Sequence, residues 1–285
     1  MRRPIEAPRL AVSVICSSLI ALAAAPGACL AAGQAQLPAA NAARLALDRQ
    51  VQGRAIMMKM AQLLAGAPHF RVNLHMAYDA VQQSGQKVEF HESRTVLVSR
   101  PDRLRIDGTR SDGEQALTVF TGKDVVLVDH ASMVYATAPQ PGTLDDTIVY
   151  FVRDLGMRLP LAFMLLGRLP AELQERVRSV EYVELSSIDG AASHHIAARG
   201  DTVDMQMWVA DGAQALPQRV VLTYKTAPGQ PQFRSEFSAW DLAPEISAAM
   251  FEKPTPDGLQ KVAFAAQLPR VAPAAAASAA KQGAR

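Results

Sequence analysis

The stretch FRVNLHMAYDAVQQSGQKVEFHESRTVLVSRPDRLRID, residues 70–107, decides the fold class. Apolar side chains occupy every second position from Phe70 to Tyr78, which is the spacing of a strand with one buried face. Turn residues then separate this strand from two more, predicted over residues 87–98 and 103–107. Three strands joined by such short turns predict an antiparallel sheet.

The same hairpin spacing continues along the chain on both sides of a central helical segment. Further strands are predicted over residues 116–121, 124–128, 133–137, 180–187, 193–198, 203–209, 219–226, 232–242 and 260–264. Helices are predicted over residues 42–67 and 144–155, with a short helical piece over 245–250. Because helices do not alternate with the strands, we expect an antiparallel α+β domain rather than a Rossmann-type fold.

The N-terminus has the features of a secretory signal peptide. Arg2, Arg3 and Arg9 precede an apolar run over residues 10–25, and small residues follow it. Cleavage after Ala31 or Ala35 fits this pattern, and an uncleaved N-terminal anchor is the alternative. We expect four parts, namely a signal peptide over 1–31, a flexible segment over 32–43, a folded domain over 44–268 and a disordered Ala/Pro-rich tail over 269–285.

The positions of the cysteines and the distribution of charge exclude several classes of function. Cys16 and Cys29 both lie in the signal segment, so a mature chain cut after Ala31 has no thiol catalysis and no Cys-ligated metal. Lipid anchoring through Cys29 is an alternative, although residues 26–28 lack the aliphatic residue of a lipobox. The formal charge of +2 resides in the signal peptide and the tail, which leaves the folded body slightly acidic. Nucleic-acid binding needs a concentrated basic patch and is therefore excluded.

The histidines do not form a recognisable metal site. His91-Glu92 begins like the zinc-binding H-E-x-x-H motif, but Thr95 stands where the second histidine belongs. His194 and His195 are neighbours on a predicted strand, so their side chains point to opposite faces and do not chelate one ion. We expect no metal and no cofactor.

The chain also lacks the common catalytic motifs, including G-x-S-x-G and the glycine-rich phosphate loops. Asp145 and Asp146 resemble an acid/base pair, but they follow Thr143 at a predicted helix start, where the helix dipole favours carboxylates. Either Thr143 or Asp145 is expected to cap that helix. We expect no catalytic residue and no enzyme.

Apolar side chains gather in places where they suit a binding cavity. Met205 and Met207 share one face of a predicted strand, and the apolar segment over residues 159–177 adds more. Methionine is flexible and polarizable, which suits an adaptable pocket. Ordinary core packing is the alternative. The candidate cavity and lid residues are Ile148, Phe151, Phe163, Met164, Met205 and Met207.

Three blocks of the sequence resemble a family of predicted periplasmic proteins, domain of unknown function 2092. They are TGKDVVLVDHASMVYATAP, MWVADGAQALPQRVVLTYKTAPGQPQFRSEFSAWDLAP and MFEKPTPDGLQKVAF. More distantly, the order of parts resembles the LolA/LolB lipoprotein-carrier superfamily. A strand ends at Arg100-Pro101, and the turn Thr121-Gly122-Lys123 leads into another strand.

The superfamily resemblance implies a curved antiparallel sheet, an incomplete β-barrel, with helices lidding its concave face. It also implies a cavity for acyl chains and a lid latch at Arg100; a plain arginine at a strand end is the alternative. We therefore expect a periplasmic, monomeric, non-enzymatic protein that binds a lipid, a lipoprotein acyl chain or another apolar ligand, with transient membrane contact. A periplasmic sensor or envelope-assembly module that binds an envelope protein is the alternative.

Overall fold

The computed structural model describes residues 32–155, 159–254 and 257–264. The predicted signal peptide and tail lie outside the described residues. The chain divides into two units, residues 1–44 and 45–285, and the first contributes only the beginning of one helix to the described part. Among the described helices, none is long and apolar enough to cross a bilayer.

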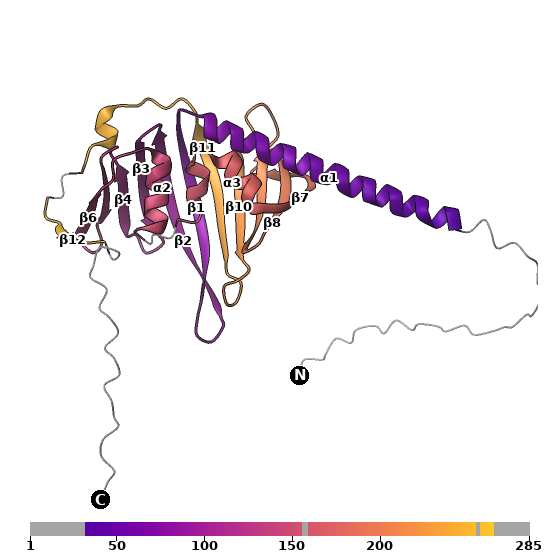
Figure 1. The fold of residues 1–285 in the computed structure, drawn as a ribbon. Coiled ribbons are helices and arrows are strands. Elements are labelled where there is room, and N and C mark those ends of the chain that lie inside the picture. Colours follow the sequence, from indigo (N-terminus) through magenta and orange to yellow (C-terminus); the bar gives the residue numbers. More distant parts are fainter. Residues whose placement is uncertain (1–31, 156–158, 255–256, 265–285) are drawn as a thin grey trace, which may run out of the picture. The chain divides into compact units, whose positions relative to one another are not determined.

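The second unit is built on one open, curved sheet (Figure 1). Twelve strands of described residues form it in the order β12-β6-β5-β4-β3-β2-β1-β11-β10-β9-β8-β7. All neighbours are antiparallel except β12 and β6, which confirms the predicted fold class. The strands are β1 (His69–Val81), β2 (Lys87–Ser99), β3 (Arg103–Arg110), β4 (Gln115–Phe120), β5 (Asp124–Asp129), β6 (Val134–Pro139), β7 (Val177–Ile188), β8 (Ala191–Gly200), β9 (Val203–Ala210), β10 (Pro217–Tyr224), β11 (Gln232–Asp241) and β12 (Gln260–Val262).

The alternation of β1 sets which face of the sheet is buried. Phe70 and Val72 are each 2% exposed, and they pair with Val98 and Val96 of β2 in register. Because side chains alternate between the two faces, a slip of one residue would move this apolar set into solvent. We call this face the covered face and the opposite one the outer face.

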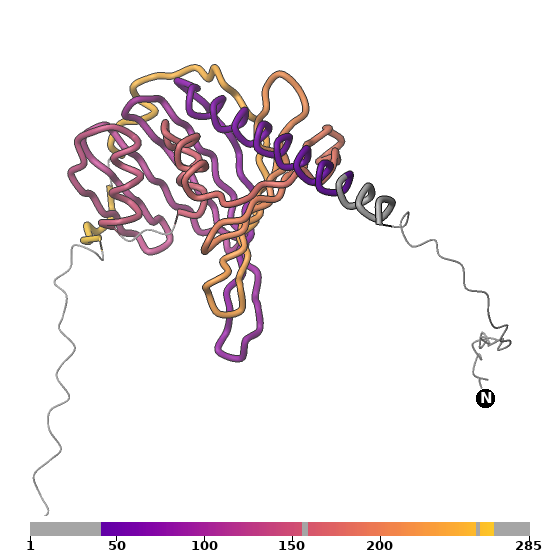
Figure 2. The backbone as a smooth tube through the Cα atoms, turned by 45° about the vertical axis from the view of Figure 1, so that its right-hand side comes forward, coloured from indigo at the N-terminus to yellow at the C-terminus, as the bar shows by residue number. Residues whose placement is uncertain are grey.

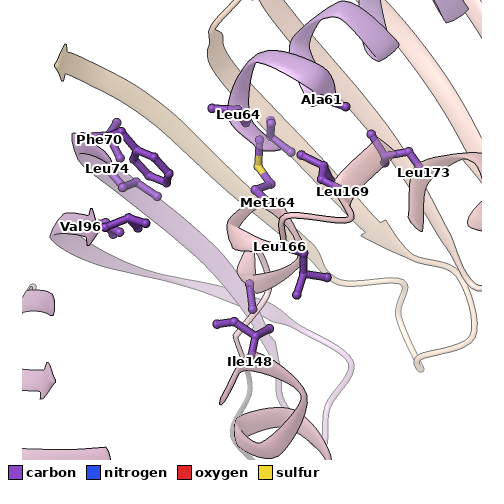
Figure 3. Close-up of a cluster of buried hydrophobic side chains, with 14 of the residues drawn as sticks. Ala61, Leu64, Phe70, Leu74, Val96, Ile148, Met164, Leu166, Leu169 and Leu173 are labelled. Carbon is purple, nitrogen blue, oxygen red and sulfur yellow. The ribbon is translucent and has the colours of Figure 1, made fainter. Parts of the chain in front are cut away.

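Helical segments pack on the covered face. They are α1 (Ala32–Gly66), α2 (Leu144–Arg153), the 3-10 helix η1 (Ala162–Leu165) and α3 (Leu169–Arg176). A further 3-10 helix, η2 (Ala248–Phe251), follows β11 and contacts the outer face, where the Arg105 guanidinium donates to the Met250 carbonyl at 3.3 Å. Ala61 and Leu64 of α1 lie beside Met164 and Leu169, within one buried apolar cluster (Figure 3). The apolar face of the sheet is thereby removed from water, which is worth about 25 cal/mol per Å².

Two helical predictions differ from the structure. The first helix begins at Ala32 instead of residue 42, so residues 32–43, expected as a flexible segment, are helical here. The short piece expected over 245–250 is the 3-10 helix Ala248–Phe251. Residues 32–41 carry no strong apolar period, which is why the sequence pattern placed the helix start too late.

The start of α2 resolves the two capping alternatives. The Thr143 side chain accepts a hydrogen bond from the Asp146 backbone N–H at 3.2 Å, and the Asp146 carboxylate accepts from the Thr143 N–H at 3.1 Å. This reciprocal pair is a capping box, so Thr143 is the cap. The hydrogen bonds from Thr143 lower the pKa of Asp146, as expected of a helix-start carboxylate.

Gly53 allows α1 to lie directly against β7. A Cβ atom at this position would stand 2.8 Å from the backbone nitrogen of Tyr182 and 3.0 Å from the carbonyl carbon of Glu181. Both neighbours are backbone atoms, which have little freedom to retreat. The close approach therefore requires a residue without a side chain.

We expect Gly53→Ala to destabilise the domain by about 1–3 kcal/mol through overpacking, even though alanine favours helices. Gly66→Ala is the matched control, because nothing lies within 4 Å of a Cβ at Gly66. That variant should be neutral or stabilised by up to about 1 kcal/mol. Urea unfolding of both variants measures the difference, and equal stabilities would contradict the close packing.

Asp79 joins the β1–β2 hairpin to the β10–β11 hairpin. Its carboxylate accepts hydrogen bonds from the Gln232 backbone N–H and the Arg234 guanidinium, both at 2.9 Å. Burial alone would raise the pKa of Asp79, but the hydrogen bonds from Arg234 and Gln232 outweigh it and lower that pKa. The folded state therefore favours the ionised carboxylate.

Because the folded pKa of Asp79 is depressed, its contribution is present above the unfolded value of about 3.8 and is lost as the pH falls through the folded pKa. We expect Asp79→Asn to be less stable than the wild type near neutral pH, with a shallower loss of stability from about pH 5 downwards. Asp48→Asn, on the exposed part of α1, is the control. Urea unfolding across pH should show the flattened profile for Asp79→Asn alone.

Candidate functional site

Two apolar hollows lie between the covered face and the helical segments. The first has a volume of about 60 Å³ and opens between β1, β2, β3 and β11 and the segment Leu159–Leu165. Leu64, Phe70, Leu74, Val96 and Met164 are five of its lining residues, and all are labelled in Figure 3. Other lining residues are Met76, Ile106, Phe233, Phe237 and Trp240.

The second hollow is larger, at about 200 Å³, and lies between α3 and strands β8, β9 and β10. Its lining residues include Phe163, Leu173, Val177, Ala198, Met205 and Leu222. Glu172, Arg176 and Arg199 are its charged lining residues. The Glu172 carboxylate is 2.9 Å from Arg168 and 2.7 Å from Arg176, so its charge is balanced within α3 and the residue before it.

One short piece of chain borders both hollows. We call residues 159–166, which include η1, the strap. Pro160 lines both hollows, while Met164 lines the first and Phe163 the second. The strap therefore forms part of the wall of each hollow.

The structure distributes the six predicted cavity residues over three places. Met164 lines the first hollow, and Phe163 and Met205 line the second. Ile148 and Phe151 of α2 are 3% and 0% exposed, Met207 of β9 is 0% exposed, and none of these three lines either hollow. They belong to the buried core around the hollows.

Trp240 is a lining residue that the sequence pattern missed. Strict alternation with Phe237 would place Trp240 on the outer face, but a bulge at Ala239, whose φ is 50°, returns it to the covered face. Its ring stacks on Phe237 with centroids 5.8 Å apart, and its indole N–H donates to the Pro217 carbonyl at 2.9 Å. A bulge of this kind leaves no dependable signal in a single sequence.

Arg100, at the turn that follows β2, joins the strap to the rest of the fold. Its guanidinium donates to the Leu165 carbonyl of the strap at 2.8 Å and to the Ala67 carbonyl after α1 at 3.2 Å. The Asp145 carboxylate lies 3.8 Å away and itself accepts from the Gly167 backbone N–H at 2.8 Å. Burial lowers the pKa of Arg100 and Asp145 opposes that change, so the group stays charged.

The histidines follow the geometry expected from the sequence. His194 lies 3.1 Å from Asp211, whereas His195 lies 3.1 Å from Gln206 and stacks on Trp208 at 4.1 Å between ring centroids. The two rings therefore have separate partners on opposite faces. Within the described ranges, no three His, Cys, Asp or Glu side chains are grouped as metal ligands would be.

Comparison with known proteins identifies a family. The family model described as "Predicted periplasmic protein (DUF2092)" matches residues 53–265. No curated protein matches the chain.

Several solved structures are similar to the chain at low sequence identity. Lipoprotein LppX of Mycobacterium tuberculosis matches with 12% identity and a TM-score of 0.45, over 68% of this chain and 97% of that one. A LolA superfamily protein of Nitrosomonas europaea matches with 12% identity and a TM-score of 0.35, over 70% and 97%. MucB in the MucA/MucB complex of Pseudomonas aeruginosa matches with 12% identity and a TM-score of 0.40, over 74% and 63%.

We expect Arg100→Lys to loosen the strap, because an ammonium does not reproduce the forked contacts with two carbonyls. Leaving one carbonyl without its donor should cost about 1–3 kcal/mol. Hydrogen exchange should accelerate over the strap, and urea unfolding should report the loss of stability. Arg153→Lys, which alters only an exposed pair with Asp154, is the control and should change stability by less than about 0.5 kcal/mol. Unchanged exchange in the strap would contradict this role of Arg100.

Proposed function

The chain belongs to the family of predicted periplasmic proteins, DUF2092, and we propose that it is a non-enzymatic periplasmic protein that binds an apolar ligand on its covered face. The ligand class is a lipid, a lipoprotein acyl chain or a similar apolar molecule. The observation that supports the proposal is the pair of apolar hollows that border the same strap. A core that served only stability would gain from closing these spaces, since interiors pack to the density of organic crystals.

The sizes of the hollows define what each conformation accommodates. An apolar cavity of about 150 Å³ suffices to bind benzene, so the second hollow takes a short apolar group without rearrangement. Pockets for larger ligands usually measure about 300–1,000 Å³. A full acyl chain therefore requires the strap to move, and each methylene it buries contributes about 0.8 kcal/mol towards that movement.

The contacts of the strap suit such a movement. The Arg100 guanidinium donates a hydrogen bond to the Leu165 carbonyl of the strap. The Asp145 carboxylate accepts one from the backbone N–H of Gly167, the residue that follows the strap. If the closed state is favoured by only a few kcal/mol, a ligand that binds the open state more tightly shifts the equilibrium towards the open state. In this proposal Arg100 is the latch of the lid.

The polar side chains at the hollows support binding rather than catalysis. Arg94 lines the first hollow and donates to both carboxylate oxygens of Glu92, at 2.6 and 3.1 Å. Glu172 at the second hollow lies between two arginines. A general acid or base requires a proton position free to exchange with substrate, and charges committed to fixed pairs serve that purpose poorly.

A protein-binding role is the second candidate, and the edge strand β7 favours it. β7 is an edge strand of the sheet, with a neighbouring strand on one side only. Its Val183 and Leu185 side chains are 40% and 56% exposed. An exposed edge of this kind accepts a strand from another chain. In this reading the protein is a sensor or envelope-assembly module.

We expect protein purified from the periplasm to carry acyl lipids that native mass spectrometry and solvent extraction detect. The delipidated protein should bind a fluorescent long-chain fatty acid. Met205→Trp fills part of the second hollow and should weaken this binding by about tenfold or more, the equivalent of about 1.4 kcal/mol. Leu185→Trp, on the exposed edge of β7, should leave the affinity unchanged. A wild-type protein that carries no lipid and binds no probe would refute the proposal.

A further inference from the structure

Two hairpins extend the sheet beyond the helical segments. Figures 1 and 2 show the β1–β2 and β10–β11 turns side by side, where they project from the middle of the sheet beyond the ends of the other strands. The Lys87 ammonium donates a hydrogen bond to the Gln230 carbonyl at 3.3 Å, and the Asp79 carboxylate accepts one from the Gln232 N–H at 2.9 Å. Because these contacts tie the tips together, the hairpins present one continuous surface.

Along β1, the apolar side chains of the covered face continue onto this extension, beside the Arg94–Glu92 pair of β2. Met76 and Phe233 line the first hollow. The next covered-face residue of β1 towards the tip is Tyr78, which pairs with Phe233 on one side and with Phe90 on the other. An apolar path therefore leads from the first hollow to Tyr78 and Phe90.

Tyr78 and Phe90, which we call the aromatic ledge, are exposed although they lie on the face that is buried elsewhere. They are 38% and 39% exposed, and their rings stack with centroids 5.8 Å apart and planes inclined by 20°. Exposed apolar surface of aromatic side chains is unfavourable by about 25 cal/mol per Å². A contiguous aromatic pair at the end of an apolar path is the pattern of a contact site.

The charged side chains next to the ledge form ion pairs with one another. Arg94 and Glu92 form a pair on the covered face of β2, and Asp79, Arg234 and Glu89 form a network on the outer face. The outer-face network holds two carboxylates and one guanidinium, so it does not favour an anionic group, and an uncharged apolar occupant fits the ledge best.

We propose that the aromatic ledge binds the part of an acyl chain that the first hollow does not hold, and so serves as the mouth through which the chain reaches the covered face. This inference rests on the proposed function. Even taken together, the hollows of about 60 and 200 Å³ are smaller than the 300–1,000 Å³ of pockets for larger ligands, so part of a long chain must lie outside them. Continuity through Met76 and Phe233 makes the ledge the apolar surface that this remainder meets.

The test compares the double variant Tyr78→Thr/Phe90→Thr with the matched control Val183→Thr/Leu185→Thr. Both pairs are exposed apolar residues on strands, and threonine keeps the strand preference. Fluorescent fatty acids of 8 and 16 carbons are titrated against each protein. We expect the ledge variant to bind the 16-carbon probe about tenfold more weakly, the 8-carbon probe with an affinity within about twofold of wild type, and the control to match the wild type.

Each outcome separates this inference from the proposed function. A wild type that binds neither probe refutes the proposed function. A wild type that binds the long probe, together with a ledge variant of equal affinity, overturns the inference alone. Sedimentation showing that the ledge variant abolishes a wild-type dimer while probe binding persists also overturns it, because the ledge would then be a contact between copies.

A second variant keeps the inference testable if the double variant does not fold. Phe90→Trp retains an aromatic ring and places a fluorescent reporter on the ledge. Fatty acids brominated along the chain should quench the added emission on binding, relative to the wild type with Trp208 and Trp240 alone. Binding of the brominated chain without quenching of the added emission overturns the inference.

Discussion

The central constraint on this protein is the pairing of β1 with strands on both of its sides. β1 pairs with β2, its sequence neighbour, and with β11, which follows it by about 150 residues. Both pairings bury the same alternate side chains, beginning with Phe70, Val72 and Leu74. A shift on either side would turn this set towards water, so the register of the centre dictates which face every other strand presents to the helices.

Covering a sheet of this width with short helical segments leaves spaces. The helices meet the sheet closely where small residues allow it, as at Gly53 on β7, and leave hollows on either side of the strap. The strap is held near its C-terminal end by a polar contact, in which the Arg100 guanidinium donates to the Leu165 carbonyl. The stability of the closed conformation and the access to the apolar face are therefore linked, because one segment serves both.

Much of the architecture could be predicted from the residue pattern alone. Alternation and turn residues predicted all twelve strands of the described chain to within a few residues, because a half-buried strand requires a period of two. The start of α2 was predicted with two possible caps, and its geometry selects Thr143. The predicted start of α1 at residue 42 was wrong, because the helix begins at Ala32 and its first ten residues have no apolar period to detect.

The candidate site was less predictable, for a physical reason. Apolar residues look alike in sequence whether they fill a core or line a hollow, so Met164 and Met205 were grouped with Met207, which is fully buried. Trp240 reached the first hollow through a bulge that only its neighbours in the sheet reveal. The sequence by itself determined the antiparallel sheet and the apolar face, because each depends on local periodicity. The tertiary structure alone decided where that face is left uncovered, because a hollow is a property of the distances between distant segments.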